Sequence, residues 1–320
     1  MAPLLEVKDL RTSFFTEAGE VRAVDGVSFT VDPGKLMGLV GESGSGKTAT
    51  VLSIMRLLSE NARVVGGSII FESRDLLGIS EPAMRAIRGA QIAMIFQEPM
   101  TSLNPVFTIG SQIGEAIRLH QRTSRRETRD RTIEALRIVG IADSEHRIGD
   151  YPHQLSGGMR QRVMIAMALA CHPKLLIADE PTTALDVTIQ AQILDLIREL
   201  QQRFGLAVIL VTHDLGIVAQ YADDVTILYA ARVMEQAPAA ELFRNPLNPY
   251  TRGLLDSIPG IGAHRHTRLR AIPGAIPNAL APPSGCRFHP RCPLAIDDCA
   301  RVEPPLAPRS PNHSVACIRV

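Results

Sequence analysis

The chain has no excess of charge of one sign and no tryptophan. Its 34 basic and 33 acidic residues leave a formal net charge of +1. Nucleic-acid-binding proteins usually carry a basic excess, so this balance predicts no nucleic-acid partner. With 45% hydrophobic and 21% charged residues, the composition is that of a globular protein, and the 320 residues allow roughly two domains.

Long apolar runs are also missing. The longest, from Val163 to Cys171, is far shorter than the ~20 residues that span a bilayer. The N-terminal residues contain Glu6 and Asp9 and lack the apolar core of a signal peptide. We therefore expect a cytosolic protein, and nothing in the sequence forbids docking on a membrane partner.

Cysteine is scarce and unevenly placed. Of the five cysteines, Cys171 lies alone in an apolar, helix-like run and is most simply a small core residue. The other four fall within the last 35 residues and are Cys286, Cys292, Cys299 and Cys317. Because disulfides are rare in cytosolic proteins, this clustering predicts a bound metal or metal cluster.

Unbroken apolar runs predict buried strands at residues 36–40, 175–179, 207–212 and 225–229. Between them, residues 187–204 carry apolar side chains at helical spacing. Buried strands that alternate with helices indicate an α/β fold with a mainly parallel sheet covered on both faces.

Other segments have different patterns. Residues 4–31 alternate apolar and polar positions, which suggests paired strands before residue 41. Residues 90–97 indicate a short buried strand ending at Gln97, and residues 98–165 are helical and charged, as in a helical subdomain inserted into the sheet. We therefore expect a first domain over residues 1–235.

Repeated prolines after residue 236 break any long element and predict a loop-rich C-terminal extension, residues 236–320. The apolar content of this extension is thin for an ordinary core. The four clustered cysteines are therefore expected to stand in for a core by holding a metal.

Residues 41–48, the phosphate loop, read Gly-Glu-Ser-Gly-Ser-Gly-Lys-Thr and match G-x-x-x-x-G-K-[ST] directly after the strand at 36–40. The backbone N–H groups of such a loop and the start of the next helix face a phosphate chain. Lys47 would meet the β- and γ-phosphates, and the Thr48 hydroxyl would bind Mg²⁺. The chain is therefore expected to bind a nucleoside triphosphate.

Two further segments carry chemistry. The strand at 175–179 ends in Asp179 and is followed directly by Glu180. Asp179 would hold Mg²⁺ through water, and Glu180 would polarise the attacking water. Ser156, followed by Gly157 and Gly158, is expected to cap a helix whose amides can approach an anion. Two phosphate-binding helix starts for one nucleotide predict two chains that face each other and hold each nucleotide between them.

The chain resembles the ATP-binding cassette (ABC) ATPases, the motor subunits of transporters, in the family's full set of motifs over residues 1 to about 235. In sequence order these are the phosphate loop, Gln97, Leu155 to Met159, Asp179-Glu180, Ala184 to Asp186 and His213. The resemblance implies an ABC fold with an antiparallel β-subdomain and a helical subdomain, and ATP hydrolysis as the activity.

The resemblance also implies a role for each matched residue. Gln97 would contact Mg²⁺ and the attacking water and couple the site to the membrane subunits. Ser156, Gly157 and Gly158 would contact the γ-phosphate of the ATP bound to the opposite chain, and Asp186 would act across the dimer. His213 would hold the γ-phosphate and orient Glu180. The residues expected to bind ATP are Phe14, Gly41, Glu42, Ser43, Gly44, Ser45, Gly46, Lys47, Thr48 and Thr50.

Plainer interpretations stay open for three of these residues. Phe14 or its neighbour Phe15 could belong to the core instead of stacking on adenine. Gln97 could merely cap a strand, and His213 could be only a polar residue at a strand end.

The C-terminal extension resembles the tail of cassettes from dipeptide and oligopeptide importers. The resemblance lies in residues 245–252, Leu254-Leu255, Ile258-Pro259 and residues 285–293. Its cysteines follow C-x₅-C-x₆-C-x₁₇-C, a motif at which some relatives carry a [4Fe–4S] cluster. Four thiolates suit either an iron–sulfur cluster or zinc. Zinc ribbons usually have paired cysteines that are closer together in the sequence than these. Free thiols stay an alternative. His289 and His313 lie near enough in sequence to be ligands, but four cysteines suffice without them.

Together these features predict the ATPase subunit of a bacterial peptide importer, peripheral to the cytoplasmic face of the inner membrane. Its partners would be two membrane permeases, a second cassette (more often a different chain) and, indirectly, an extracytoplasmic peptide-binding protein. Nickel, glutathione or another small solute is the alternative cargo. A soluble cassette of DNA repair or the ribosome, or a non-catalytic regulatory cassette, fits less well because no second cassette is present and both Glu180 and His213 are.

Overall fold

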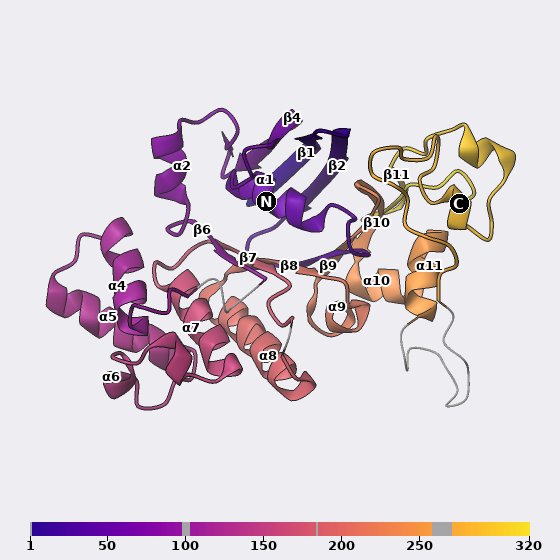
Figure 1. Ribbon diagram of the computed structural model, residues 1–320. Helices are drawn as coiled ribbons and strands as arrows, with labels where there is room; N and C mark the ends of the chain where they lie inside the picture. The colour runs from indigo at the N-terminus through magenta and orange to yellow at the C-terminus, as the bar shows by residue number, and fades with distance from the viewer. Residues whose placement is uncertain (1, 98–102, 184, 258–270) are drawn as a thin grey trace. The chain divides into compact units, whose positions relative to one another are not determined.

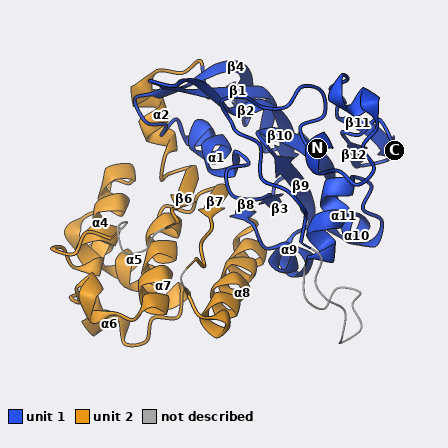
Figure 2. Cartoon of the chain, turned by 45° about the vertical axis from the view of Figure 1, so that its right-hand side comes forward, with its two compact units in different colours: residues 1–77, 210–320 blue, residues 78–209 orange. Residues whose placement is uncertain are grey.

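The computed structural model describes residues 2–97, 103–183, 185–257 and 271–320 (Figure 1). The chain divides into two compact units, shown in different colours in Figure 2. Unit 1 comprises residues 1–77 and 210–320, and unit 2 comprises residues 78–209. The predicted Ala184 and Ile258-Pro259 lie outside the described residues.

Unit 1 contains a four-stranded antiparallel sheet in the order β2-β1-β4-β5. Its strands are β1 (Leu5–Thr16), β2 (Gly19–Val31), β4 (Ala62–Phe71) and β5 (Arg74–Asp75). Strand β1 pairs with β2 on one side and with β4 on the other. The predicted pairing of strands within residues 4–31 is confirmed, together with the antiparallel subdomain.

The second sheet of unit 1 carries the phosphate loop. Strand β3 (Leu36–Val40), buried at every position, pairs in parallel with β9 (Asp224–Tyr229). The antiparallel strands β10 (Arg232–Pro238), β12 (His313–Val315) and β11 (Ala307–Ser310) then extend the sheet in that order. The helices of this unit are α1 (Lys47–Met55), α9 (Leu215–Tyr221), α10 (Ala239–Arg244) and α11 (Pro249–Asp256), with short 3₁₀ turns at His289–Arg291 and Asp297–Ala300.

Unit 2 combines two parallel strands with helices (Figure 1). Strand β6 (Ile92–Ile95) pairs with β7 (Leu175–Asp179), which is buried throughout. Strand β8 (Ala207–Thr212) begins in this unit and ends in unit 1. The helices are α2 (Glu81–Ile87), α4 (Ile109–His120), α5 (Arg125–Ile138), α6 (Ser144–Arg147), α7 (Gly157–Leu169) and α8 (Val187–Phe204), with a 3₁₀ turn at Pro152–Gln154.

The predicted α/β fold class is confirmed. The strands expected at 36–40, 175–179 and 207–212 and the helix expected at 187–204 have the predicted bounds. Unbroken apolar runs form these strands because both faces of a parallel sheet are covered. The division into residues 1–235 and 236–320 stays a prediction, since β10 runs across residue 236 and residues 271–320 fall in unit 1.

The C-terminal extension has an apolar core, contrary to the expectation that its apolar content is too thin. Tyr250, Leu255 and Phe288 from the extension are buried in one cluster with Ile227 and Tyr229 of β9. The ring centroid of Tyr229 lies 4.6 Å from that of Tyr250 and 5.2 Å from that of Phe288. The extension therefore shares its core with the central strands, which a count of its own apolar residues does not reveal.

A buried carboxylate fixes the turn that begins the extension. Glu235 on β10 is fully buried and accepts hydrogen bonds from the backbone N–H groups of Leu247 and Asn248, at 2.7 and 3.0 Å. His313 Nε2 lies 2.7 Å from the same carboxylate. Asn248 in turn donates to the carbonyls of Met234 and Ala316. Pairing offsets the cost of burying these polar groups.

Candidate nucleotide site

The ends of the phosphate loop are tightly packed and its centre is open. A Cβ atom at Gly41 would overlap the carbonyl oxygen of Leu228, and one at Gly46 would overlap that of Ala23. Gly46 also has φ +100°, a conformation that favours glycine. At Gly44, in contrast, no described atom lies within 4 Å of the Cβ position. The loop therefore exposes backbone at its middle, as close approach of a phosphate chain requires.

Lys47 opens helix α1 and bends back over the phosphate loop. Its ammonium donates to the carbonyls of Gly41 and Glu42, at 2.8 and 3.0 Å, and the residue is only 6% exposed. Thr48 follows on the first turn and is exposed. Thr50 is buried, and its hydroxyl donates to the Gly46 carbonyl at 2.8 Å, so its expected contact with ATP stays a prediction.

Ser43 and Gly44 are the exposed residues at the middle of the loop, and Glu42 is half-buried. The Ser45 hydroxyl is buried without a hydrogen-bond partner in the described part of the chain. A buried hydroxyl of this kind is available to a ligand or water.

The two aromatic side chains near the end of β1 differ in exposure. Phe14 is half-buried, opposite Val21 on β2 and Ala62 on β4. Phe15 is 39% exposed and packs under the guanidinium of Arg63, whose Cζ lies 4.3 Å from the ring centroid. Stacking of Phe14 on adenine stays a prediction.

In unit 2, the ends of the parallel strands β6 and β7 bring two predicted residues together. The Gln97 side-chain amide donates to Glu180 Oε2 at 3.2 Å, and the Thr183 hydroxyl donates to the same oxygen at 3.1 Å. Glu180 follows β7 directly with a left-handed φ of 45°, while Asp179, the last residue of β7, is 2% exposed. Strained backbone at a strand end is common where a side chain serves a function.

The glycines after Ser156 begin helix α7, and Ser156 caps it as predicted. The Ser156 hydroxyl accepts from the Met159 N–H at 3.3 Å. A Cβ at Gly158 would lie 2.8 Å from Cγ2 of Ile189 in the first turn of α8, so glycine permits close packing of the two helix starts. Asp186 caps α8 by accepting from the Ile189 N–H at 3.0 Å. Two capped helix N-termini therefore lie side by side.

His213 comes directly after β8, in unit 1, and is exposed. The next residue, Asp214, caps helix α9 by accepting from the N–H groups of Gly216 and Ile217. The cap fixes the turn that carries the imidazole.

Two ion pairs connect the C-terminal extension to earlier parts of unit 1, and the local sequence pattern predicts neither of them. Arg291 pairs with Glu42 of the phosphate loop, and Arg287 pairs with the buried Asp25 on β2. Both arginines lie between Cys286 and Cys292. Two arginines in so short a stretch are the signal that could have indicated acidic partners.

The four clustered cysteines lie near one another but do not form a metal site. Burial raises the pKa of the Cys286 thiol, and the neighbouring thiols of Cys317, Cys299 and Cys292 raise that pKa as well. Within residues 2–97, 103–183, 185–257 and 271–320, no three His, Cys, Asp or Glu side chains are arranged to hold a metal ion. As arranged, the thiols do not fit an iron–sulfur cluster or zinc.

The two histidines considered as ligands have other partners. His313 faces Glu235, and His289 Nδ1 lies 2.8 Å from the Cys286 carbonyl oxygen. Cys171, expected in the core, is half-buried, and its thiol faces the Ala116 carbonyl at 3.6 Å.

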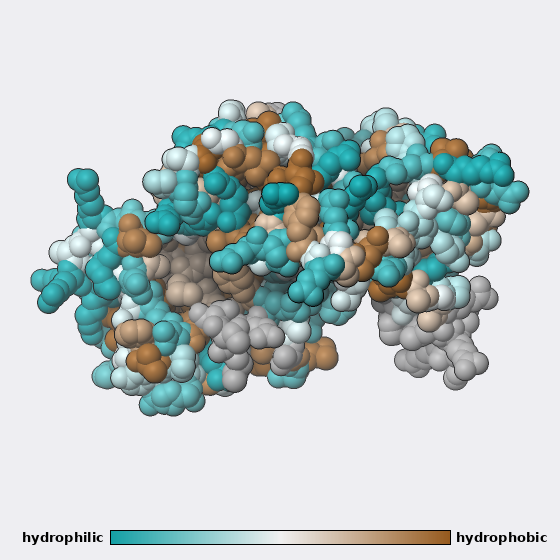
Figure 3. All heavy atoms as spheres, turned by 45° about the horizontal axis from the view of Figure 1, so that its top comes forward, coloured by the Kyte–Doolittle hydropathy of each residue, from teal (hydrophilic) through white to brown (hydrophobic). Residues whose placement is uncertain are grey.

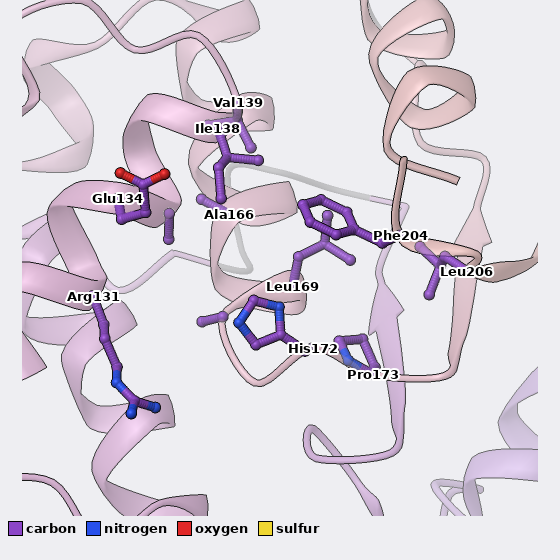
Figure 4. Close-up of a pocket in the computed structure, with 12 residues that line it drawn as sticks. Arg131, Glu134, Ile138, Val139, Ala166, Leu169, His172, Pro173, Phe204 and Leu206 are labelled. Atoms are coloured by element: carbon purple, nitrogen blue, oxygen red, sulfur yellow. The ribbon is translucent and has the colours of Figure 1, made fainter. Parts of the chain in front are cut away.

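Unit 2 also has an apolar pocket of about 580 Å³ that the sequence does not indicate. Figure 4 shows that helix α5 supplies Arg131 and Glu134 to its wall and that Phe204 and Leu206 come from the end of α8 and the turn after it. None of the predicted site residues lines this pocket. The predicted nucleotide motifs therefore do not account for this pocket.

No helix in the described part of the chain is long and apolar enough to cross a membrane. On the face drawn in Figure 3, hydrophobic residues lie in small groups among hydrophilic ones. Single exposed apolar side chains are ordinary on protein surfaces.

Comparisons with known proteins agree with the motifs. Residues 24–183 match the family "ABC transporter", and residues 234–299 match "Oligopeptide/dipeptide transporter, C-terminal region". The chain is 54% identical to a probable peptide ABC transporter ATP-binding protein, y4tR, of Sinorhizobium fredii, over 99% of this chain and 95% of that protein. It is 50% identical to the dipeptide transport ATP-binding protein DppD of Haemophilus influenzae, over 95% of this chain and 92% of that protein.

Among solved structures, the chain resembles the ATP-binding cassette MJ0796 in a dimeric post-hydrolysis state bound to ADP and Pi. The TM-score is 0.66 at 26% identity, over 73% of this chain and 98% of that chain. The predicted ABC fold is thereby confirmed. With a family match over half of its length and relatives at 50% identity or more over nearly all of it, the chain belongs to the ABC transporter family, as an ATP-binding subunit with an oligopeptide/dipeptide-transporter C-terminal region.

Proposed function

We propose that the protein hydrolyses ATP to drive a bacterial importer of dipeptides or oligopeptides. The observation that carries this proposal is the combination, in one chain, of an ABC phosphate loop with the C-terminal region of peptide transporters. The named relatives are ATP-binding proteins of peptide and dipeptide transport. We assign residues 1–235 to the ATPase cassette and residues 236–320 to the transporter-specific extension.

In this proposal, positioning and electrostatics do the chemistry. The phosphate loop binds the triphosphate through its backbone N–H groups, and Lys47 adds positive charge at the β- and γ-phosphates. Glu180, steadied by Gln97 and Thr183, accepts a proton from the attacking water and aims it in line with the leaving oxygen. His213 holds the γ-phosphate.

Mg²⁺ would supply positive charge to the phosphate oxygens, and Thr48, Gln97 and Asp179 would hold it. The donor set fits, because a hydroxyl, an amide oxygen and a carboxylate are the hard oxygen ligands that Mg²⁺ prefers. Thr48 and Gln97 are also exposed.

We further propose that two cassettes share each ATP. Ser156, Gly157, Gly158 and Asp186 would contact the nucleotide held by the phosphate loop of the opposite cassette. The paired helix starts of α7 and α8 support this, because N–H groups at helix N-termini favour an anion. The MJ0796 cassette is dimeric in its solved structure. For this chain we propose a different cassette as the partner.

The same proposal gives the protein two membrane permeases as partners and places it at the cytoplasmic face of the inner membrane. Cargo would reach the permeases through an extracytoplasmic peptide-binding protein. The exposed Gln97 and its exposed neighbour Phe96 would couple the site to the permeases.

Uptake of labelled peptides tests the cargo. Deleting the gene should reduce uptake of a labelled di- or tripeptide at least about 10-fold, because an importer without its motor cannot complete its cycle. Uptake of a free amino acid serves as the control. If peptide uptake persists while nickel or glutathione uptake is lost, the machinery carries that solute and the peptide assignment is wrong.

We also propose that an iron–sulfur cluster binds to the protein in the cell once the side chains of four cysteines have turned toward one another. These are Cys286, Cys292, Cys299 and Cys317. Support comes from their spacing and from the mutual influence of their thiols on the pKa of Cys286. The full-length protein, purified without oxygen, should then be brown and contain iron and sulfide, and Cys299→Ser should remove most of the iron while Cys171→Ser should not. Colourless protein with stoichiometric zinc would decide for zinc, and protein without either metal would leave the cysteines as free thiols.

A further inference from the structure

An arginine of the C-terminal extension holds the side chain of Glu42 in the phosphate loop. Arg291 Nη1 donates to Glu42 Oε2 at 2.7 Å, and Nη2 donates to Oε1 at 3.1 Å, so the pair is bidentate. The Arg291 side chain is 5% exposed and that of Glu42 is 24% exposed. The pair joins residues that are 249 positions apart in the sequence.

The guanidinium of Arg291 is itself fixed from several sides. Its Nε donates to the Pro273 carbonyl at 2.9 Å, and Nη1 also donates to the Tyr229 hydroxyl at 3.3 Å. The hydrogen bonds that Arg291 donates to Glu42 raise the pKa of Arg291 above its usual value, so the side chain stays charged. A cation with this many partners can hold a flexible carboxylate in one place.

A second residue of the extension reaches the backbone of the same loop position. The Glu42 N–H donates to the Tyr250 hydroxyl oxygen at 3.1 Å. Tyr250 is fully buried against Tyr229 and Phe288, and burial raises the pKa of its phenol, so the hydroxyl stays neutral. The extension thus contacts both the side chain and the backbone of Glu42.

Glu42 puts a negative charge into a loop that must receive a polyanion. An unpaired carboxylate beside a triphosphate weakens binding through like-charge repulsion, which is strong where water is largely excluded. Pairing with Arg291 neutralises this charge and turns the carboxylate toward the extension.

We propose that Arg291 is a positioning residue of the nucleotide site, which sets nucleotide affinity by neutralising the Glu42 carboxylate and holding it toward the C-terminal extension. The proposal depends on nucleotide binding, which the family match supports, and not on peptide as the cargo. Loss of the peptide assignment would therefore leave this proposal intact.

The test compares Arg291→Gln with the double variant Glu42→Gln/Arg291→Gln, as purified full-length chains. Arg291→Gln should raise the dissociation constant of Mg·ADP, measured by calorimetry, by about 10-fold. The double variant should recover most of this loss, because the carboxylate that needs neutralising is gone. A purely structural role of Arg291 predicts no recovery.

Two further variants serve as controls. Arg252→Gln removes an exposed arginine of the same extension, which donates to the Pro246 carbonyl, and should leave nucleotide affinity unchanged. Arg291→Lys keeps the positive charge but loses the bidentate hydrogen bonding of the guanidinium. Its affinity for Mg·ADP should therefore lie between that of wild type and that of Arg291→Gln. Thermal melting of each variant identifies any that fails to fold.

Unchanged affinity in Arg291→Gln would overturn the proposal, as would a double variant that binds no better than Arg291→Gln. Should Arg291→Gln fail to fold, Glu42→Gln alone decides. Glu42→Gln removes the Glu42 carboxylate and keeps the Arg291 guanidinium, so this variant should bind Mg·ADP at least as tightly as the wild-type protein does. A 10-fold loss in Glu42→Gln would contradict neutralisation as the role of Arg291.

Discussion

Replacing Lys47 with alanine is expected to reduce ATP hydrolysis by the assembled transporter at least about 100-fold, because one preorganised charge at the phosphates contributes that much. The Lys47 ammonium is held at the phosphate loop by the carbonyls of Gly41 and Glu42 and is shielded from water. Its charge is therefore fixed before nucleotide arrives. Release of inorganic phosphate from saturating Mg·ATP measures the effect.

Lys35→Ala is the matched control for Lys47→Ala. Lys35 precedes β3, is exposed and lies outside the loop, so its loss should change turnover less than about twofold. Turnover by Lys47→Ala within twofold of wild type would show that this lysine does not serve the phosphates.

Changing Glu180 to glutamine is expected to stop turnover and to leave nucleotide binding intact. Glutamine has nearly the same shape and can still meet Gln97 and Thr183, but it cannot take a proton from water. General bases contribute about 10² to 10⁴ in rate, so phosphate release should fall by that factor. The affinity for Mg·ATP, measured by calorimetry, should stay within about threefold of wild type.

Glu199→Gln is the matched control for Glu180→Gln, because it also replaces a carboxylate with an amide and removes one negative charge. Glu199 is exposed on α8 and belongs to none of the motifs, so its variant should hydrolyse ATP at the normal rate. If Glu180→Gln also hydrolysed at that rate, Glu180 would be excluded as the group that polarises the water.

Local patterns predicted the parts of the fold that depend on nearby residues. The strand at 175–179 could be read from its apolar run, because a strand buried on both faces has no polar alternation to obscure it. The phosphate loop and the Ser156 cap are fixed by residues within a few positions of one another. The contact of Gln97 with Glu180 follows from the parallel pairing of β6 with β7, which places the carboxyl ends of both strands at one edge.

Contacts between distant segments could not be predicted in the same way. The pairing of Glu42 with Arg291 and of Glu235 with His313 depends on how the extension folds against β9 and β10, and a single sequence does not record that packing. For the same reason the extension was expected to lack a core, although Tyr250 and Phe288 pack on Tyr229. Cysteine spacing indicated a cluster of thiols but not the directions of their side chains.

Light scattering of full-length Glu180→Gln with Mg·ATP, alone and mixed with its partner cassette, tests the shared nucleotide site most directly. ATP should convert single chains into pairs of twice the mass, and Mg·ADP should not. Glu180→Gln combined with Ser156→Arg should stay single, because a bulky cation at the α7 start would block the opposite nucleotide. If the mass with ATP stays that of one chain in both samples, two cassettes do not share ATP.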